Sequence, residues 1–409
     1  MKLLVVTQYF FPEDFRINEL VSDFVKRGHE VTVLTGRPNY PEGKIFKEYA
    51  KNKRKFNQFS GSNIIRCPIP ARGSSKISLI LNYFAFIFFG TIYGLYAAKN
   101  NKFDNIFVFE PSPITVCLPA IFIKKFFRIP VTFWVLDLWP DTLEAVGILR
   151  RKTFIWKMLD KLVKFIYENC DLILGQSRGF VQEIKKYCSD DADVKFFPNW
   201  IEEVYSNPIS SKTGLISEDP AILKIIFAGN IGEAQDFPTI VSAVKSVSKE
   251  QKILLYVLGD GRFKENLKSL IQINDLQNNI ILLGRHPITD MPTFFYEADA
   301  LLVSLKPNKI LDKTIPGKVQ SYLNSKKPVL AVLSGEGASV IQDSRSGFVS
   351  KPGHANSLAS SIKNLALLSN KERLAMGMSG YTYAQKHFKK DKILDELEFW
   401  LLQLAKRAV

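Results

Sequence analysis

Short apolar runs alternate with amphipathic helical patterns along the chain, and this alternation begins twice. In the first half the strand-like runs lie at residues 2–7, 31–34, 63–66, 105–109, 131–136 and 172–175. In the second half they lie at residues 223–228, 253–258, 280–283, 300–305 and 328–333. Strands that alternate with helices build parallel sheets with helices on both faces. The sequence therefore predicts an α/β protein with two Rossmann-like domains.

A polar stretch rich in chain-breaking residues, 206–221, separates the two series and predicts a linker. We expect an N-terminal domain over residues 1–205 and a second domain over 206–385. A C-terminal helix over 386–409 is expected to pack back on the first domain. Ligands of open α/β sheets bind beyond the carboxyl ends of the strands, so the site is expected in a cleft between facing domains.

The formal net charge is +15, and the excess is local. Residues 44–164 hold 20 basic and 7 acidic side chains around a very apolar segment. This distribution favours an anionic membrane surface as partner over nucleic acid, for which no module is present. A lysine-rich genome is an alternative explanation for part of the excess of positive charge. Scattered cysteines and the lack of a signal-peptide pattern predict a cytoplasmic protein, peripheral or monotopic at the inner face of the membrane.

The apolar segment at residues 77–98 contains no charged side chain and is long enough to span a bilayer. Its polar residues and glycines, and the strands on either side, argue against a spanning helix. Two alternatives remain open. The segment is either a helix buried in the domain core or an interfacial helix that dips into one leaflet.

Acidic residues follow two strands of the first half. Asp137 lies just beyond the run 131–136, where a carboxylate can act as a base toward a hydroxyl or orient one. Glu110 ends the run before it and either faces the site or only terminates the strand. Asp141 follows Pro140 and fits a helix N-cap better than a catalytic group.

The second half carries glycines and lysines where a phosphate could bind. Gly229, Asn230 and Gly232 follow its first strand, and Gly261 follows the next, so a backbone could approach a ligand closely. Tight turns explain the same glycines. Lys318 opens a helix, where a lysine is unfavourable unless an anion binds, although a solvated lysine remains possible. Lys306, Lys309 and Lys313 lie just upstream.

Several segments together resemble glycosyltransferase family 4, whose members are retaining enzymes with the GT-B fold. They are residues 5–13, 27–35, 137–141, 198–199, 227–232, 259–261 and 316–329. The resemblance covers nearly the whole chain. It is strongest to bacterial enzymes of O-antigen, capsule and colanic-acid synthesis, among them N-acetylfucosaminyl transferases.

The resemblance implies that the first domain holds the acceptor and the second the nucleotide sugar. Asp137 and Glu110 are the catalytic candidates, and Glu13, Arg16 and Asp141 the acceptor-binding candidates. The donor-binding candidates are Gly229, Asn230, Gly232, Gly261, Arg285, Lys306, Lys318 and Gln320.

This chain also departs from the family's pattern. Asp137 stands where many relatives carry a histidine, and Asn230 and Gln235 where they carry an arginine and a lysine. The two glutamates usual in the family are replaced by Lys313 and Ser321. These replacements put the donor contacts and the retaining outcome in question. Lys318 and the upstream Lys306, Lys309 and Lys313 are the candidates that take over the diphosphate contacts.

The resulting hypothesis is transfer of a sugar, such as N-acetylfucosamine, from a UDP-sugar to an undecaprenyl-diphosphate-linked saccharide. No cofactor or metal is expected. The Asp191–Asp193 pair follows polar residues and fits an exposed turn better than a metal site. The alternatives are a nucleotide-sugar epimerase of the same fold and a non-catalytic membrane scaffold.

Overall fold

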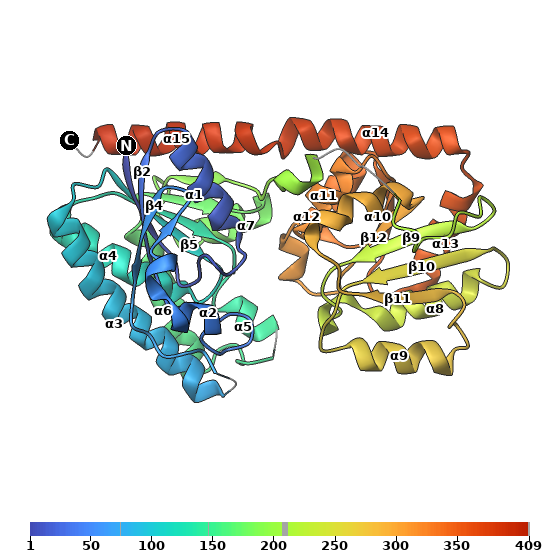
Figure 1. Cartoon of the computed structure of the whole chain (residues 1–409), viewed down its shortest axis with the longest axis horizontal. Coiled ribbons are helices and arrows are strands. Elements are labelled where there is room, and N and C mark those ends of the chain that lie inside the picture. The colour runs from blue at the N-terminus through green and yellow to red at the C-terminus, as the bar shows by residue number, and fades with distance from the viewer. Residues whose placement is uncertain (74, 146, 207–211, 408–409) are drawn as a thin grey trace. The chain divides into compact units, whose positions relative to one another are not determined.

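The structure is a computed structural model that describes residues 1–73, 75–145, 147–206 and 212–407 (Figure 1). The chain forms two compact units. Unit 1 comprises Met1–Phe197 and the residues from Leu394 onward, and unit 2 comprises Pro198–Ile393. The predicted fold class is confirmed, because each unit is a parallel sheet with helices on both faces.

The sheet of unit 1 has the strand order β3-β4-β2-β1-β5-β6-β7-β8. The strands are β1 (Lys2–Val6), β2 (Glu30–Thr35), β3 (Gln58–Phe59), β4 (Ser62–Arg66), β5 (Asn105–Glu110), β6 (Val131–Val135), β7 (Leu172–Gly175) and β8 (Val194–Phe196). The helices are α1 (Arg16–Lys26), α2 (Lys47–Lys51), α3 (Lys76–Asn100), α4 (Leu118–Phe127), α5 (Asp141–Ala145), α6 (Phe154–Glu168) and α7 (Arg178–Lys185). Only the short β3 pairs antiparallel among the described strands.

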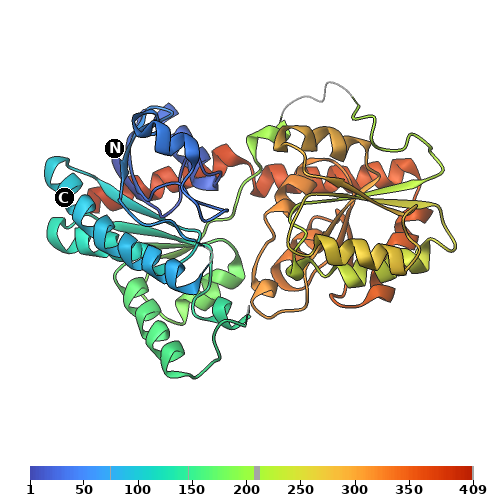
Figure 2. The same cartoon turned by 60° about the horizontal axis from the view of Figure 1, so that its bottom comes forward.

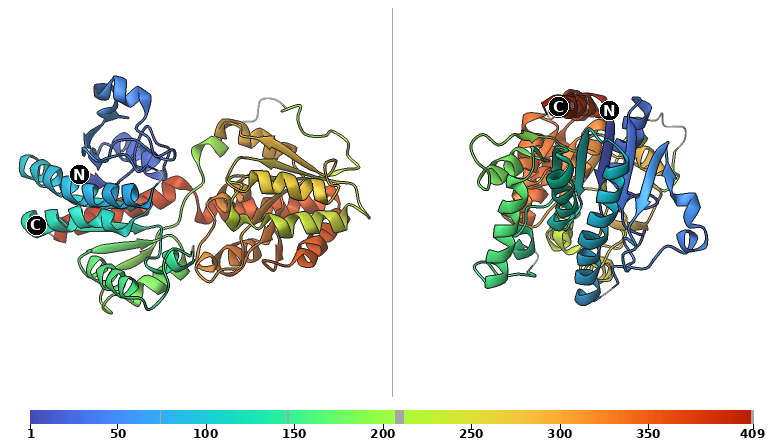
Figure 3. Two further views of the ribbon diagram at one scale, coloured as in Figure 1. Left: turned by 90° about the horizontal axis from the view of Figure 1, so that it is seen from below. Right: turned by 90° about the vertical axis from the view of Figure 1, so that its left-hand side faces the viewer.

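Apolar residues of α3, α4, α6 and α7 share one core with the sheet of unit 1. In two views α3 and α4 lie side by side (Figure 3). The turn that follows α1 is joined by ion pairs to the last helix, α15 (Lys390–Arg407). Arg27 Nη1 lies 2.6 Å from Asp395 and 2.7 Å from Glu398, and His29 Nε2 lies 2.7 Å from Glu398. These contacts hold the end of the chain on unit 1.

The sheet of unit 2 has the strand order β11-β10-β9-β12-β13-β14, with parallel pairs throughout its described strands. The strands are β9 (Leu223–Ala228), β10 (Ile253–Leu258), β11 (Ile280–Gly284), β12 (Ala300–Ser304), β13 (Val329–Val332) and β14 (Gly347–Ser350). The helices are α8 (Phe237–Val247), α9 (Lys264–Ile273), α10 (Met291–Glu297), α11 (Lys318–Asn324), α12 (Gly335–Asp343), α13 (Ala355–Leu367) and α14 (Asn370–His387). Helices α8, α9 and α13 pack on one face, as Figure 2 shows for α8 and α9, and α10, α11, α12 and α14 pack on the other.

The predicted linker at 206–221 is only partly a linker. Residues 207–211 lie outside the described residues. From residue 212 onward the segment is attached to unit 2, because the Thr213 amide donates to Glu297 at 2.6 Å and Ile216 is buried. The Ser217 amide also donates to the Tyr256 hydroxyl at 2.9 Å.

Helix α3 is a surface helix, so the alternative of a helix buried in the core is wrong. Small residues on its inner side allow close packing; a Cβ on Gly94 would lie 2.6 Å from the Ile123 side chain. The outer side is exposed, with Phe84 66% and Phe88 61% accessible. Among the described helices α3 alone has the length and hydropathy to cross a membrane, and 22% of its most apolar window is buried.

Candidate functional site

A cavity of about 360 Å³ lies in unit 2 where β9, β10 and β11 end. Its lining residues are Tyr205, Ala228, Gly229, Asn230, Leu258, Gly259, Asp260, Arg285, His286, Ile288, Met291, Phe295, Lys318 and Tyr322. The next strand after β11, β12, pairs on the other side of β9, so the strand order reverses beside this cavity. Such a reversal point at the carboxyl edge is where doubly wound sheets bind ligands.

Two glycines bring the backbone close to this cavity. Gly229 and Gly259 have φ values of +139° and +138°, which side chains of L residues rarely tolerate. A Cβ on Gly259 would lie 1.8 Å from the Gly229 carbonyl oxygen, and a Cβ on Gly229 would lie 2.8 Å from Lys318 Nζ. Both positions therefore require glycine, which lets the two turns and the Lys318 side chain pack closely together at the wall of the cavity.

Lys318 is half-buried, and its ammonium nitrogen is enclosed from solvent at the wall of this cavity. Its ammonium lies 3.9 Å from the centre of the Phe227 ring and has no hydrogen-bond partner among the described residues. Burial lowers the pKa of Lys318 to about 7, because a buried ammonium loses its hydration. An unpaired buried cation is costly, and an anionic ligand would remove that cost.

Aromatic side chains complete the lining of the cavity, and none of them was predicted from the sequence to lie there. The Tyr322 hydroxyl accepts from the Ala228 amide at 2.9 Å, which fixes the turn that leads to Gly229. Tyr205 stacks on Phe295 with ring centres 5.5 Å apart. His286 was missed although it directly follows Arg285 at the end of β11, a position that could have identified it.

Of the eight predicted donor residues, the cavity brings together Gly229, Asn230, Arg285 and Lys318. The other four do not line it. Gly232 and Gly261 belong to the neighbouring turns, where the Gly232 amide donates to Gln235 and the Gly261 amide to Asp260. Gln320 is buried within α11.

Lys306, Lys313 and Ser321 do not line the cavity. The Lys306 ammonium forms an ion pair with Glu233, so it is not a free cation of the cavity. Ser321, at one of the two family glutamate positions, is buried in α11. Lys313, at the other, lies half-buried in the 3-10 turn Leu311–Lys313.

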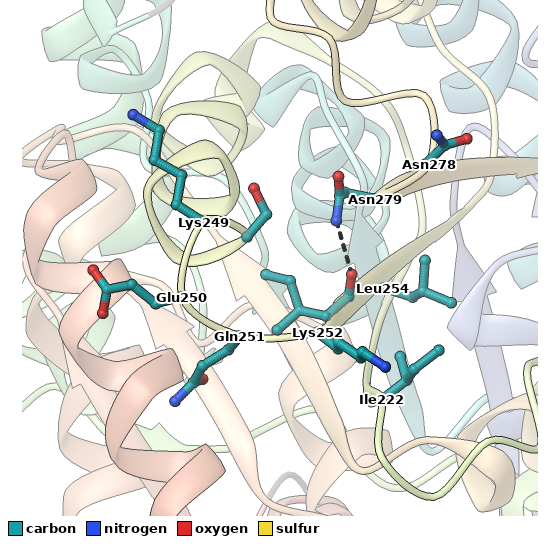
Figure 4. Close-up of a pocket in the computed structure, with 10 residues that line it drawn as sticks. Ile222, Lys249, Glu250, Gln251, Lys252, Leu254, Asn278 and Asn279 are labelled. Carbon is teal, nitrogen blue, oxygen red and sulfur yellow. Dashed lines mark hydrogen bonds between the residues drawn. The ribbon is translucent and has the colours of Figure 1, made fainter.

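A second cavity of about 380 Å³ lies at the opposite edge of the same sheet (Figure 4). It surrounds the start of β10, where the Asn279 side chain donates to the Ile253 carbonyl at 3.3 Å. It contains none of the predicted site residues. The amino ends of the strands face this cavity, so the fold gives no reason to place the donor there.

In unit 1 the two catalytic candidates adjoin each other. The Glu110 carboxylate accepts from the amides of Leu136 (3.3 Å) and Asp137 (3.5 Å). Burial first, and then the negative charge of Asp137, raise the pKa of Glu110 well above its usual range. Glu110 is fully buried, and its contacts are with backbone amides, so it positions the Asp137 backbone rather than meeting a substrate.

Asp137 is only half-buried and keeps a reactive carboxylate. Burial raises the pKa of Asp137 to about 6, while a hydrogen bond from the Ser112 side chain acts in the opposite direction. The group is thus mostly ionised at neutral pH, yet close enough to its pKa to accept a proton. A general base needs this combination.

The predicted acceptor contacts lie at three places in unit 1. Glu13 is buried after β1, and its oxygens accept from the amides of Phe10 (3.1 Å), Asn39 (2.7 Å) and Tyr40 (2.6 Å). It thereby joins the loops after β1 and β2, and burial raises the pKa of Glu13 to about 7 despite these amides. Arg16 and Asp141 are half-buried first residues of α1 and α5.

No group of three or more His, Cys, Asp or Glu side chains suited to a metal occurs in the part of the chain that the structure describes. Asp193 of the Asp191–Asp193 pair forms an ion pair with Lys195 at 2.7 Å. Asp191 is exposed in a turn. The structure thus places Lys318 in a cavity of unit 2 and Asp137 at a strand end of unit 1.

Two family profiles match the chain. The profile described as glycosyltransferase family 4 matches residues 16–204, and that described as glycosyl transferases group 1 matches residues 223–367. Glycosyltransferase WbjE of Pseudomonas aeruginosa is 26% identical over 261 residues, 61% of this chain and 64% of that protein. The colanic acid biosynthesis glycosyl transferase WcaI of Escherichia coli is 23% identical over 338 residues, 79% of this chain and 81% of that protein.

Solved structures share the fold at low sequence identity. A sucrose-phosphate synthase from Thermosynechococcus elongatus has a TM-score of 0.78 at 14% identity, with 98% of each chain covered. HepE from Anabaena, solved in complex with UDP, has a TM-score of 0.71 at 13% identity, covering 98% of this chain and all of that one. The two profile matches, on two Rossmann-like units, show that the chain belongs to glycosyltransferase family 4, with the GT-B fold.

Proposed function

We propose that the protein transfers a sugar from a nucleoside diphosphate, with UDP as the expected carrier, to a lipid-linked saccharide in surface-polysaccharide synthesis. The observation that carries this proposal is Lys318. Its buried, unpartnered ammonium adjoins the glycine turn at Gly229, in a cavity at the carboxyl edge of the sheet. A diphosphate leaving group supplies the anion that this site lacks, and its growing charge is stabilised there during transfer.

The comparisons support the same assignment. WbjE and WcaI are named as glycosyltransferases, the latter of colanic acid biosynthesis, and HepE was solved with UDP. We infer the corresponding activity for this chain. Transfer of an N-acetylated deoxyhexosamine such as N-acetylfucosamine, with retention, is the more detailed proposal. It rests on the family resemblance, and Lys313 and Ser321 replace the usual glutamates.

We assign the acceptor to unit 1, with Asp137 as the base for its hydroxyl. A lipid-linked acceptor, proposed to be an undecaprenyl diphosphate saccharide, also gives a reason for the exposed apolar side of α3. The basic residues around this helix suit the anionic lipids at the inner face of a membrane. Peripheral attachment there is part of the proposal.

Affinity for UDP should fall as the pH rises above 7. The pKa of Lys318 is about 7 before a ligand binds, so raising the pH deprotonates the free site. At higher pH, Lys318 must therefore take up a proton before it can bind the diphosphate. The affinity for UDP then falls by up to tenfold for each pH unit. Calorimetric titrations of UDP between pH 7 and 9 measure this slope. A flat profile in the wild type, equal to that of Lys318→Ala, would contradict the assignment.

Membrane attachment should depend on the outer side of α3. Phe84→Glu combined with Phe88→Glu places two charges on exposed positions, so the protein should stay folded and bind anionic vesicles roughly tenfold or more weakly. Co-sedimentation with phosphatidylglycerol vesicles measures the loss.

The matched control is Leu367→Glu with Leu374→Glu, two exposed apolar residues of unit 2. This pair should leave vesicle binding unchanged. Equal binding by both double variants would exclude α3 as the contact surface.

The proposed function is tested by incubating the protein with radiolabelled UDP-sugars and a bacterial lipid extract. Appearance of label in the lipid fraction is the expected result. Conversion of the free nucleotide sugar without any acceptor would indicate an epimerase instead. Absence of binding to every nucleoside diphosphate tried would favour a scaffold without catalysis.

A further inference from the structure

Polar side chains of unit 1 remain without partners beside the start of α3. Tyr9, just beyond β1, is 3% exposed, and its hydroxyl has no hydrogen-bond partner among the described residues. A buried hydroxyl without a partner is unfavourable, and native structures seldom retain one without a reason. The Tyr9 ring is held by Tyr40, with ring centres 5.4 Å apart, and by stacking on Phe15 at 5.6 Å.

Arg72 brings a positive charge to the same place. Its guanidinium lies 5.6 Å from the centre of the Tyr40 ring and forms no ion pair within the described part of the chain. The Arg72 amide donates to the Asn39 side chain at 2.9 Å, which fixes the loop before α3. The charge of Arg72 acts on the hydroxyls of Tyr9 and Tyr83, lowering the pKa of each against the larger, raising effect of burial.

Helix α3 itself contributes Tyr83, which lies within electrostatic reach of Asp137. The preceding residue, Asn82, anchors the helix, because its side chain accepts from Gln8 and donates to the Pro70 carbonyl at 2.6 Å. The first turns of α3 therefore have two different sides. Their outer side carries exposed Ile77, Ile80 and Phe84, and Tyr83 belongs to a polar cluster next to the candidate base.

We propose that Tyr9, Arg72 and Tyr83 form an oxyanion subsite of unit 1 that holds the diphosphate of a lipid-linked acceptor. This assignment rests on the proposed function. A guanidinium and two hydroxyls are donors that match phosphate oxygens. A lipid chain attached to this diphosphate can follow the apolar outer side of α3, and the acceptor sugar can lie toward Asp137. A phosphate oxygen of the ligand would also give the Tyr9 hydroxyl a hydrogen-bond partner.

Geranyl diphosphate is a suitable probe, titrated calorimetrically into the protein saturated with UDP. Arg72→Ala and Tyr9→Phe should each weaken its binding roughly tenfold, and Arg72→Lys should recover part of the loss. Arg54→Ala removes the same charge from an exposed position of unit 1 and should bind like the wild type. Wild-type affinity in both Arg72→Ala and Tyr9→Phe would overturn the subsite.

Thermal unfolding distinguishes a ligand contact from a structural role. Tyr9→Phe removes a buried hydroxyl that has no partner, so the ligand-free protein should be as stable as the wild type or more stable. A lower melting temperature together with the lower affinity would instead make Tyr9 structural and contradict the proposal.

Two further measurements distinguish an acceptor diphosphate from a lipid headgroup, and the subsite from the donor site. Binding of Arg72→Ala to phosphatidylglycerol vesicles should be unchanged, and its loss would assign the subsite to membrane headgroups instead. If UDP fails to bind the wild type, the proposed function falls and the subsite with it. If UDP binds but geranyl diphosphate affinity does not depend on Arg72, only the subsite falls.

Discussion

Replacing Lys318 by alanine should weaken UDP binding roughly 30- to 100-fold. The ammonium is buried in a cavity and has no partner among the described residues, so a diphosphate would gain a charge-assisted contact worth about 2–3 kcal/mol. The same contact strengthens as charge develops on the leaving group, so kcat should fall as well. Lys318→Arg should recover the function only in part, because a planar guanidinium does not fit the space of a compact ammonium.

A second variant distinguishes a loss of UDP binding from a loss of folding. Lys318→Met keeps the apolar stem and removes the unpaired charge, so it should raise the melting temperature while it lowers UDP affinity. Lys249→Ala, at the opposite edge of the same sheet, is the matched control and should bind UDP normally. Titration calorimetry and thermal unfolding measure both properties. Unchanged UDP affinity in Lys318→Ala would show that this lysine does not bind the diphosphate.

Replacing Asp137 by asparagine should lower kcat by roughly 10²- to 10³-fold and leave UDP affinity nearly unchanged. The carboxylate is the candidate base for the acceptor hydroxyl, and a positioned base typically contributes a factor of this size. With a pKa of about 6, its catalytic form is lost as the pH falls through 6, so wild-type kcat should decline below that value.

Steady-state kinetics with the lipid-linked acceptor measures the effect of Asp137→Asn. The control is Asp190→Asn, which removes an exposed carboxylate of the same unit. Wild-type turnover in Asp137→Asn would show that this carboxylate has no catalytic role.

The fold could be predicted because its signals are local. Apolar runs such as residues 223–228 mark strands directly, and Pro238 marks the first turn of α8. Strands β8 and β14 were missed, since each has three or four residues of which most are only half-buried. Their assignment depends on a neighbouring strand, which no short stretch of sequence specifies.

The candidate site was predicted less completely, because a cavity is assembled from residues far apart in the sequence. Gly229 and Lys318 could be identified from strand ends and helix starts, and they line one cavity. Lys306 looked equally suitable in the sequence, but the structure pairs it with Glu233. Tyr205 and Phe295 carried no local signal, because their roles arise from stacking across the unit.

Glu110 shows the same limit in unit 1. The sequence indicated an acid at a strand end, which suits either a catalytic group or a terminating one. Only its complete burial and its two amide contacts distinguish these roles. Helix α3 is a further case, because composition did not decide between a core helix and a surface helix, whereas its exposed phenylalanines do.

The cavity beside Lys318 is expected to bind a nucleoside diphosphate sugar. A thermal-shift screen of the wild type and Lys318→Ala against UDP-, GDP- and dTDP-sugars tests it most directly. A ligand at 100 times its dissociation constant stabilises the folded protein by about 2.7 kcal/mol. We expect at least one sugar nucleotide to raise the melting temperature of the wild type, and the alanine variant to lose most of that increase. No shift with any of them, or an equal shift in both proteins, would contradict the claim.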